Sequence, residues 1–214
     1  MSCNLDLYKF ENEIWNKNYK YIVGTDEAGR GPMAGPLVVA AVILPQDLKI
    51  EGLNDSKKLT AKMREKLYDE IIKGAVEYQV QFIDNEDVDN LNVYQASKIG
   101  MIRCIQAFNS PVDYILSDAI NLDIGINCMS IIKGDSLSAS IAAASILAKV
   151  SRDRYMIAAS KEYPEYGFEK HKGYVTKYHL EKLKEYGPCK LHRRCFEPVR
   201  KVLFDQIKFD LEIK

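Results

Sequence analysis

The run "PLVVAAVIL" (36–44) constrains the fold most, because it contains no polar side chain. Its Val and Ile residues favour an extended strand. A strand that is apolar at every position is buried on both faces, so other elements must cover each side of its sheet. Helices usually provide this cover, and the run therefore predicts an α/β domain.

Other segments of the chain supply the remaining strands and the helices. Their patterns predict further strands near 21–25, 75–84, 112–120 and 126–135, and helices near 5–17, 60–74, 85–108 and 136–160. The helix at 136–160 is rich in Ala, which predicts close packing against the sheet. We expect a mixed five-stranded sheet that opens with hairpins and ends with two parallel strands, followed by a helical C-terminal part.

Composition sets the class of protein. The chain has 214 residues, of which 47% are hydrophobic and 28% charged, as in an ordinary globular domain with a proper core. It lacks an apolar run of roughly 18 residues, and its start lacks the apolar centre of a signal peptide, so we expect a cytoplasmic protein. The five cysteines form no CxxC pair, which argues against a zinc site or a disulfide framework.

Basic residues are concentrated near the C-terminus, although the formal net charge is zero. Residues 170–201 hold ten Lys or Arg against three Glu. Such a segment is either a phosphate-binding face or a solvated helix surface, and its composition alone leaves both readings open. The basic residues are Lys170, Lys172, Lys177, Lys182, Lys184, Lys190, Arg193, Arg194, Arg200 and Lys201.

Three of the predicted strands end in acidic residues. Asp26 and Glu27 close the first strand, Asp118 follows "YILS" and Asp135 follows "SIIKG". Parallel neighbours would bring these ends to one edge of the sheet, where four carboxylates cannot all stay ionised without cations. Hard oxygen ligands suit Mg²⁺ or Mn²⁺, and two such ions roughly 4 Å apart serve phosphodiester chemistry. Acids also follow strands simply because loops are polar. The spacing therefore favours a metal-dependent phosphoryl-transfer enzyme only moderately over ordinary polar loop residues.

Several long stretches match one known family in its own order. The chain resembles prokaryotic ribonuclease HII in "GTDEAGRGPMAGPLVVAAVIL", "LNDSKKLT", "SDA", "IKGDSLSASIAAASILAKVSRDRYM", "HKGYVTKYH" and "GPCKLHRRCFEPV". Together these stretches span nearly everything from about residue 20 to residue 200. The resemblance implies a ribonuclease H-like fold and endonucleolytic cleavage of RNA in RNA–DNA hybrids. It also implies incision on the 5′ side of a single ribonucleotide in duplex DNA, leaving 5′-phosphate and 3′-hydroxyl ends.

The resemblance also assigns residues. The family's acidic tetrad, which holds two Mg²⁺ or Mn²⁺ ions, falls on Asp26, Glu27, Asp118 and Asp135. Its Gly-Arg-Gly element falls on Gly29, Arg30 and Gly31, and its junction-sensing tyrosine on Tyr174. Only the 2′-OH distinguishes RNA from DNA at one position, and glycine lets the backbone approach it closely. Four further residues are predicted to contact phosphate or to support the site: Ser56, Lys57, Lys149 and Arg152. The alternative is that they cap helices or carry ordinary surface charge.

The sequence departs from the family at two places. Cys195 stands where a serine is expected, and Ala119 replaces the glycine that commonly follows the aspartate at 118, so the local backbone there is expected to differ slightly. About 20 residues precede the first strand, which argues against the sister family, ribonuclease HIII, with its sizeable N-terminal domain. We expect an N-terminal extension (1–19), a catalytic domain (20–185) and a C-terminal helical segment (186–214) packed on it.

Two further expectations concern partners and alternatives. The expected partners are RNA–DNA hybrid and duplex DNA containing ribonucleotides, with the protein itself a monomer. The tail "QIKFDLEI" (206–213) loosely resembles a sliding-clamp-binding peptide. The alternative is a plain amphipathic helix or strand. The alternative function is another carboxylate-cluster nuclease on the same fold, of the resolvase or exonuclease type, without 2′-OH recognition. A nucleotide-binding module is disfavoured because the chain has no GxxxxGK[ST] loop.

Overall fold

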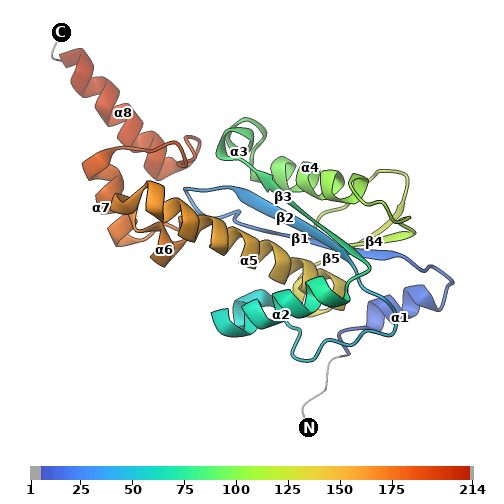
Figure 1. The fold of residues 1–214 in the computed structure, drawn as a ribbon. Coiled ribbons are helices and arrows are strands. Elements are labelled where there is room, and N and C mark those ends of the chain that lie inside the picture. Colours follow the sequence, from blue (N-terminus) through green and yellow to red (C-terminus); the bar gives the residue numbers. More distant parts are fainter. Residues whose placement is uncertain (1–5, 213–214) are drawn as a thin grey trace. The chain divides into compact units, whose positions relative to one another are not determined.

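A computed structural model of the chain (Figure 1) describes the backbone of residues 6–212 and the side chains of residues 6–205. Its strands are β1 (Ile22–Ala28), β2 (Leu37–Ile43), β3 (Glu77–Ile83), β4 (Tyr114–Asp118) and β5 (Asn127–Ile131). Its helices are α1 (Lys9–Trp15), α2 (Ala61–Gly74), α3 (Asn85–Leu91), α4 (Val93–Gln106), α5 (Ala139–Glu162), α6 (Phe168–His171), α7 (Lys177–Tyr186) and α8 (Glu197–Glu212). Short 3-10 turns are η1 (Ser56–Lys58), η2 (Gly134–Ser136) and η3 (Pro164–Tyr166).

The strands form one mixed sheet in the order β3-β2-β1-β4-β5. β1 pairs with β2 in antiparallel fashion, and Val23 lies opposite Ile43. β4 is parallel to β1, and β5 is parallel to β4. The prediction of a hairpin opening followed by two parallel strands is therefore confirmed.

The chain divides into two compact units. The first, here called the sheet unit, holds the chain up to Ala28, Val38–Phe82 and Ser97–Ser151. The second unit holds Gly29–Leu37, Ile83–Ala96 and the chain from Arg152 onward. The predicted division into an extension, a catalytic domain and a C-terminal segment stays a prediction.

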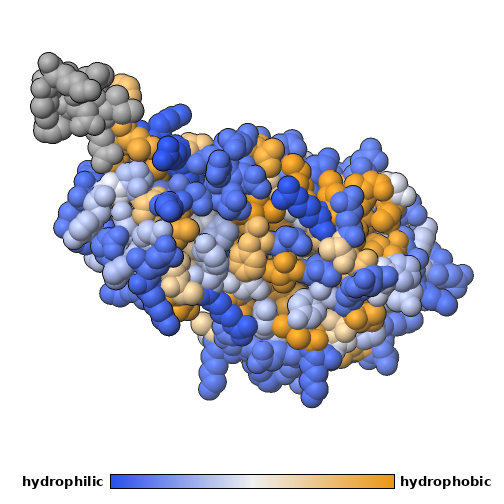
Figure 2. Space-filling model, turned by 45° about the horizontal axis from the view of Figure 1, so that its top comes forward, coloured by the Kyte–Doolittle hydropathy of each residue, from blue (hydrophilic) through white to orange (hydrophobic). Residues whose placement is uncertain are grey.

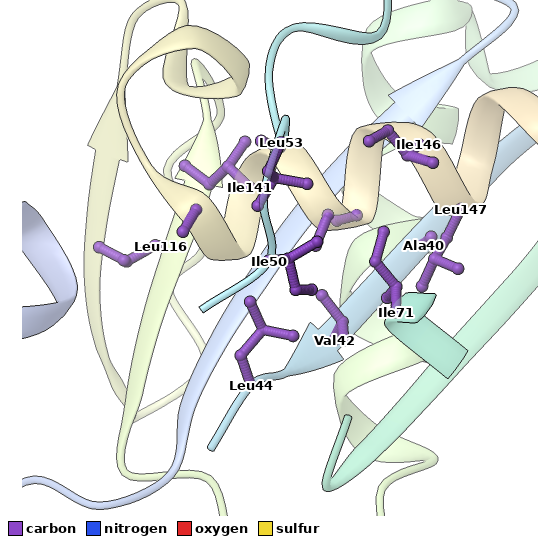
Figure 3. Close-up of a cluster of buried hydrophobic side chains, with 14 of the residues drawn as sticks. Ala40, Val42, Leu44, Ile50, Leu53, Ile71, Leu116, Ile141, Ile146 and Leu147 are labelled. Atoms are coloured by element: carbon purple, nitrogen blue, oxygen red, sulfur yellow. The ribbon is translucent and has the colours of Figure 1, made fainter. Parts of the chain in front are cut away.

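The core of the sheet unit explains the small residues of α5. Figure 3 shows Ile146 and Leu147 of α5 beside Ala40 and Val42 of β2, with Ile71 of α2 against the same cluster. The helix approaches the sheet so closely that a Cβ added to Gly24 would lie 2.1 Å from the carbonyl carbon of Ser140. The predicted close packing of this Ala-rich helix is confirmed. Within this unit, α5 and α2 cover one face of the sheet and α4 the other (Figure 1).

The segment predicted as one helix at 85–108 is broken instead. Asn92 has a positive φ of 66° and an extended ψ of 162°, which ends α3 and begins α4. Its side-chain oxygen accepts hydrogen bonds from the backbone N–H groups of Tyr94 and Gln95. Asn tolerates this backbone region and caps helices well, so one residue separates the two helices.

The surface follows the usual division between inside and outside. On the face shown in Figure 2, hydrophilic side chains dominate, and exposed apolar side chains interrupt them in several places.

Among the described residues, no helix is both long and apolar enough to span a membrane. Cys104, Cys128, Cys189 and Cys195 are all free thiols.

Candidate active site

The sheet register brings two of the predicted acids together. Thr25 of β1 lies opposite Ser117 of β4, and the next residues along these parallel strands are Asp26 and Asp118. Glu27 follows on β1 and pairs with Val39 of β2. Asp26 is buried, with 4% of its surface exposed. The expectation that parallel strand ends gather the acids is met for these residues.

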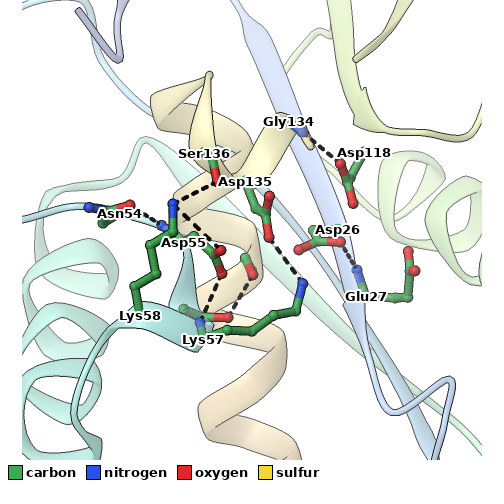
Figure 4. A network of polar contacts seen from close by, with 12 residues as sticks. Asp26, Glu27, Asn54, Asp55, Lys57, Lys58, Asp118, Gly134, Asp135 and Ser136 are labelled. Atoms are coloured by element: carbon green, nitrogen blue, oxygen red, sulfur yellow. Dashed lines mark hydrogen bonds and ion pairs between the residues drawn. The ribbon is translucent and has the colours of Figure 1, made fainter. Parts of the chain in front are cut away.

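Asp135 reaches the cluster from a turn beyond its strand. β5 ends at Ile131, Lys133 adopts a left-handed conformation with φ 59°, and Asp135 lies within η2. The backbone N–H of Gly134 donates to Oδ1 of Asp118 over 2.7 Å, which ties this turn to the end of β4. Figure 4 shows the four acids gathered in one region of the sheet unit, with Asp26 between Asp135 and Glu27.

The buried carboxyl of Asp26 is destabilised as an anion. Burial, followed by the charges of Glu27 and Asp118, raises the pKa of Asp26 well above its ordinary value. Hydrogen bonds from the Ser145 hydroxyl and the Glu27 N–H oppose this shift but do not outweigh it. The cluster therefore carries more negative charge than the surrounding groups neutralise.

Lys57 provides a cation at the edge of the cluster. Its Nζ lies 3.2 Å from Oδ2 of Asp135, and its side chain is 78% exposed whereas that of Asp135 is 5% exposed. Partial burial opposes the charge on Lys57, but Asp135 and then Asp26 raise the pKa of this lysine. Lys57 therefore forms an ion pair with an acid of the cluster, and its assignment as a substrate contact stays a prediction.

Ser56, for which a phosphate or a supporting contact was predicted, has a buried side chain. It is 3% exposed, and its hydroxyl lies 2.9 Å from that of Ser145 on α5. Ser145 also bonds to Asp26, so Ser56 supports the acid through an intermediate hydroxyl. Sequence reasoning missed Ser145, because nothing separates it from the other small residues of the helix.

The donor set fits a divalent metal ion in its chemistry. All four side chains offer hard oxygen atoms, and the raised pKa of Asp26 reflects a charge that a cation would relieve. Within residues 6–205, however, no group of three or more His, Cys, Asp and Glu is already spaced to hold a metal ion. The carboxylates would therefore have to close around an ion, with Asp135 leaving Lys57.

The second unit brings together the predicted ribose-reading residues. Residues 29–36, here called the glycine loop, begin at Gly29 with φ +102°. A Cβ on Gly29 would meet Nε of Arg152 at 2.3 Å, so only glycine fits. Gly31 is exposed and faces the Tyr174 ring, at 3.7 Å from an added Cβ. Arg30 is also exposed, and the Tyr174 side chain is 44% exposed.

Two arginines lie elsewhere than the sequence suggested. Arg152, expected near a phosphate, is 1% exposed, and Arg193, counted in the basic surface segment, is 0% exposed. Their guanidinium groups donate to backbone carbonyls instead of facing solvent. Arg193 is therefore not part of a basic surface. Arg152, for which a phosphate or a supporting contact was predicted, lies where it supports the glycine loop, because that loop encloses both charged ends. Lys149 is partly buried on α5.

Comparison with known proteins agrees with this arrangement. The family model described as "Ribonuclease HII" matches residues 23–199. A ribonuclease HII of Bacillus licheniformis is 51% identical over 191 residues, covering 89% of this chain and 75% of its own. The crystal structure of the ribonuclease H2 from Pyrococcus horikoshii OT3 matches with a TM-score of 0.76 and 27% identity, covering 88% of this chain and 99% of the other.

A further solved structure is a complex. Ribonuclease HII of Archaeoglobus fulgidus, bound to the protein PCNA, matches with a TM-score of 0.67 and 25% identity, covering 83% of this chain and 95% of the other. The sheet order and the fold of these neighbours confirm the expected ribonuclease H-like architecture. The chain therefore belongs to the ribonuclease HII family and is a hydrolytic nuclease of the ribonuclease H type.

Proposed function

We propose that the protein cleaves the RNA strand of RNA–DNA hybrids and incises duplex DNA on the 5′ side of a single embedded ribonucleotide. The observation that carries the chemistry is the buried, charge-crowded carboxyl of Asp26 beside Glu27 and Asp118. Such a cluster binds divalent cations well and gains charge balance from them. The expected products carry 5′-phosphate and 3′-hydroxyl ends.

The acids would hold the metal ions. Two Mg²⁺ or Mn²⁺ ions would be held by Asp26, Glu27, Asp118 and Asp135. When bound, such ions supply an activated water and stabilise the leaving oxygen. Ser145 would keep the Asp26 carboxylate oriented by its hydrogen bond. Lys57 would exchange its contact with Asp135 for one with a substrate phosphate.

Ribose recognition would fall to the glycine loop and Tyr174. Gly31 and Arg30 are exposed, so their backbone and the Arg30 guanidinium are accessible to a nucleic acid. Backbone groups can donate to and accept from a 2′-OH, and the guanidinium can bind the adjoining phosphate. The Tyr174 ring would pack on the following sugar and sense a deoxyribose there.

The basic C-terminal segment would grip the duplex backbone. Of its ten basic residues, Arg193 is buried and the other nine are exposed or partly exposed. Such contacts release counterions, so binding should weaken steeply as salt is raised.

Two further parts of the proposal concern partners and location. We propose that the tail contacts a sliding clamp; the Archaeoglobus relative was solved in a complex with PCNA. The backbone of residues 206–212 belongs to α8, but the side chains of "QIKFDLEI" lie outside the described residues. A monomeric, cytoplasmic protein is part of the same proposal.

The test is strand-cleavage mapping on an end-labelled DNA duplex that contains one ribonucleotide. Mg²⁺ and Mn²⁺ reactions run beside an EDTA control and an all-DNA duplex. One metal-dependent cut on the 5′ side of the ribonucleotide, with the all-DNA duplex intact, is the expected result. Cutting of both duplexes would favour the alternative nuclease without 2′-OH recognition, and no cutting by folded protein would refute the proposal.

Tyr174→Ala tests the junction role. It should impair cleavage at a lone ribonucleotide by about tenfold more than cleavage of an extended RNA–DNA hybrid, because stacking on one sugar is lost. Rates on the two substrates, measured side by side, give this ratio. Equal losses on both would contradict the role of Tyr174.

A further inference from the structure

Two buried arginines lie behind the glycine loop, and within the described residues neither guanidinium donates to a carboxylate. In the described part of the chain, all six hydrogen bonds from these guanidinium groups end on backbone carbonyls. Arg152 donates to the carbonyls of Ala34, Pro36 and Lys172. Arg193 donates twice to Gly35 and once to Arg30.

Burying both groups opposes their charge. Burial, followed by the charge of Arg152, lowers the pKa of Arg193 to about 9. The hydrogen-bond acceptors are neutral carbonyls, and the charge of Asp89 favours the charged form of Arg193 without outweighing its burial. The arginines therefore hold the backbone of this region in one arrangement and do not serve to balance charge.

That geometry joins three distant stretches of sequence. The N–H of Met33 donates to the Gly173 carbonyl, and the N–H of Gly35 to the Leu191 carbonyl. The N–H of Arg193 in turn donates to the Met33 carbonyl. The guanidinium of Arg152 bridges the loop to Lys172, two residues before Tyr174, and lies 5.9 Å from the Tyr174 ring centroid. The loop and the tyrosine are thus held by one frame.

The direction of the Arg193 bonds fixes the peptide that faces outward. The Arg30 carbonyl points inward, toward Nη1 of Arg193 at 3.3 Å. No cis peptide occurs in the described chain, so the N–H of Gly31 points away from the buried guanidinium. Gly31 is exposed, and that N–H is consequently turned toward the solvent side where a ribose would bind.

We infer that Arg193 and Arg152 are positioning residues that set the preference for a ribonucleotide over a deoxyribonucleotide by fixing the backbone of the glycine loop. This inference rests on the proposed function of that loop. Only arginine offers a planar fork that can reach two or three carbonyls at once; lysine keeps the charge but not the fork.

The test measures binding without cleavage. Fluorescence anisotropy in EDTA compares a duplex containing one ribonucleotide with the all-DNA duplex, for the wild-type protein, Arg193→Lys and Arg152→Lys. Each lysine variant should lower the ribonucleotide preference by about tenfold, which corresponds to one lost hydrogen bond, while its affinity for all-DNA duplex stays within about twofold. Arg103→Lys, an exposed arginine of α4, is the matched control and should keep the wild-type preference.

The outcomes separate this inference from the proposed function. A wild-type protein without ribonucleotide preference would refute the proposed function itself. A wild-type preference that both folded lysine variants retain would overturn the inference, and so would equal weakening on both duplexes. If the lysine variants melt below the assay temperature, Arg193→Ala with guanidinium ion in the buffer replaces them. Recovery of the preference would then support the positioning role, and failure to recover it would overturn it.

Discussion

The acid cluster of the sheet unit and the arginine frame of the second unit are both buried and charged, but they are stabilised in opposite ways. Around Asp26, burial and then the negative charges of Glu27 and Asp118 raise its pKa. Around Arg152 and Arg193, carbonyl oxygens accept every hydrogen bond that the guanidinium groups donate within the described residues. The first cluster is left for a cation to complete, whereas the second is complete within the protein.

This difference separates binding chemistry from positioning. A site that awaits a cation gains stability when one of its charges is removed, although it loses function. A frame whose hydrogen bonds are all made loses stability when any part is altered. Changes in the two regions should therefore affect stability in opposite directions.

The largest effect should come from Asp26→Asn. We expect cleavage to fall by on the order of 10³-fold or more, because a central acid of the cluster loses its charge. The metal-free variant should melt at the same or a higher temperature than wild type, since the amide relieves the crowding with Glu27 and Asp118. Cleavage assays and thermal melts in EDTA measure both. Asp123→Asn, an exposed acid, is the control, and full activity in Asp26→Asn would contradict the metal-site proposal.

The glycine loop offers a paired test. Gly29→Ala should lower the free energy of unfolding by about 2 kcal/mol or more, because φ is +102° and the new Cβ would collide with Arg152. Gly31→Ala should change it by less than about 0.5 kcal/mol, since its Cβ meets only ordinary contact with Tyr174. Urea unfolding measures both variants.

Ribonucleotide incision further separates the Gly29→Ala and Gly31→Ala variants. Gly31→Ala should stay folded yet lose incision at a single ribonucleotide, because the added methyl group would occupy the exposed side where the backbone meets the ribose. Unchanged incision by Gly31→Ala would remove Gly31 from the proposed reader. Equal unfolding free energies for the two variants would show that the loop is not held as described.

Acid should weaken the second unit through its histidines. Burial lowers the pKa of His179 to about 4, and burial together with His179 lowers that of His192 to about 3. Their Nε2 atoms lie 3.1 Å apart, and His179 Nδ1 bonds the Tyr174 carbonyl over 2.9 Å. The ordinary pKa of histidine is 6.5, so below this pH the two histidines bind protons in the unfolded chain but remain neutral in the folded chain. The free energy of unfolding therefore falls as the pH drops from about 6.5 toward 3.

The size of this loss is on the order of 3 kcal/mol for each histidine. Unfolding free energies between pH 7 and pH 4 measure it. In His192→Asn the side-chain oxygen can still accept the Cys189 N–H bond, but the titrating ring is gone. The variant should therefore lose less stability in acid than wild type. An identical acid loss in both proteins would rule out His192 as its source.

The smallest effect concerns Ala119, directly after Asp118. Ala119 adopts φ 52°, which L-residues other than glycine occupy only at a cost. The position thus has a positive φ although its residue is alanine and not glycine. Ala119→Gly should raise the free energy of unfolding by about 0.5–1 kcal/mol without altering the acids, as denaturant unfolding would reveal. A destabilised variant would mean that the alanine methyl group packs well enough to offset the strain.

Much of the fold could be predicted because its signals are local. The apolar run at 36–44 predicted a buried strand, and the helix predicted from about Thr60 begins there, with the Thr60 hydroxyl accepting from the N–H of Met63. The motifs identified the family, and the acids chosen at or just past the strand ends were Asp26, Glu27, Asp118 and Asp135. These features depend on neighbours in the chain, so a pattern of residue types is enough to find them.

The tertiary structure decided the rest. Arg193 looked like one more basic residue in a basic segment, and Ser145 like one more small residue in a helix. Their roles arise from partners far away in sequence: the carbonyls of Arg30 and Gly35 for Arg193, and Asp26 and Ser56 for Ser145. Composition can give a residue's charge or size, but whether that charge faces water or a buried carbonyl depends on which distant segments the fold brings together.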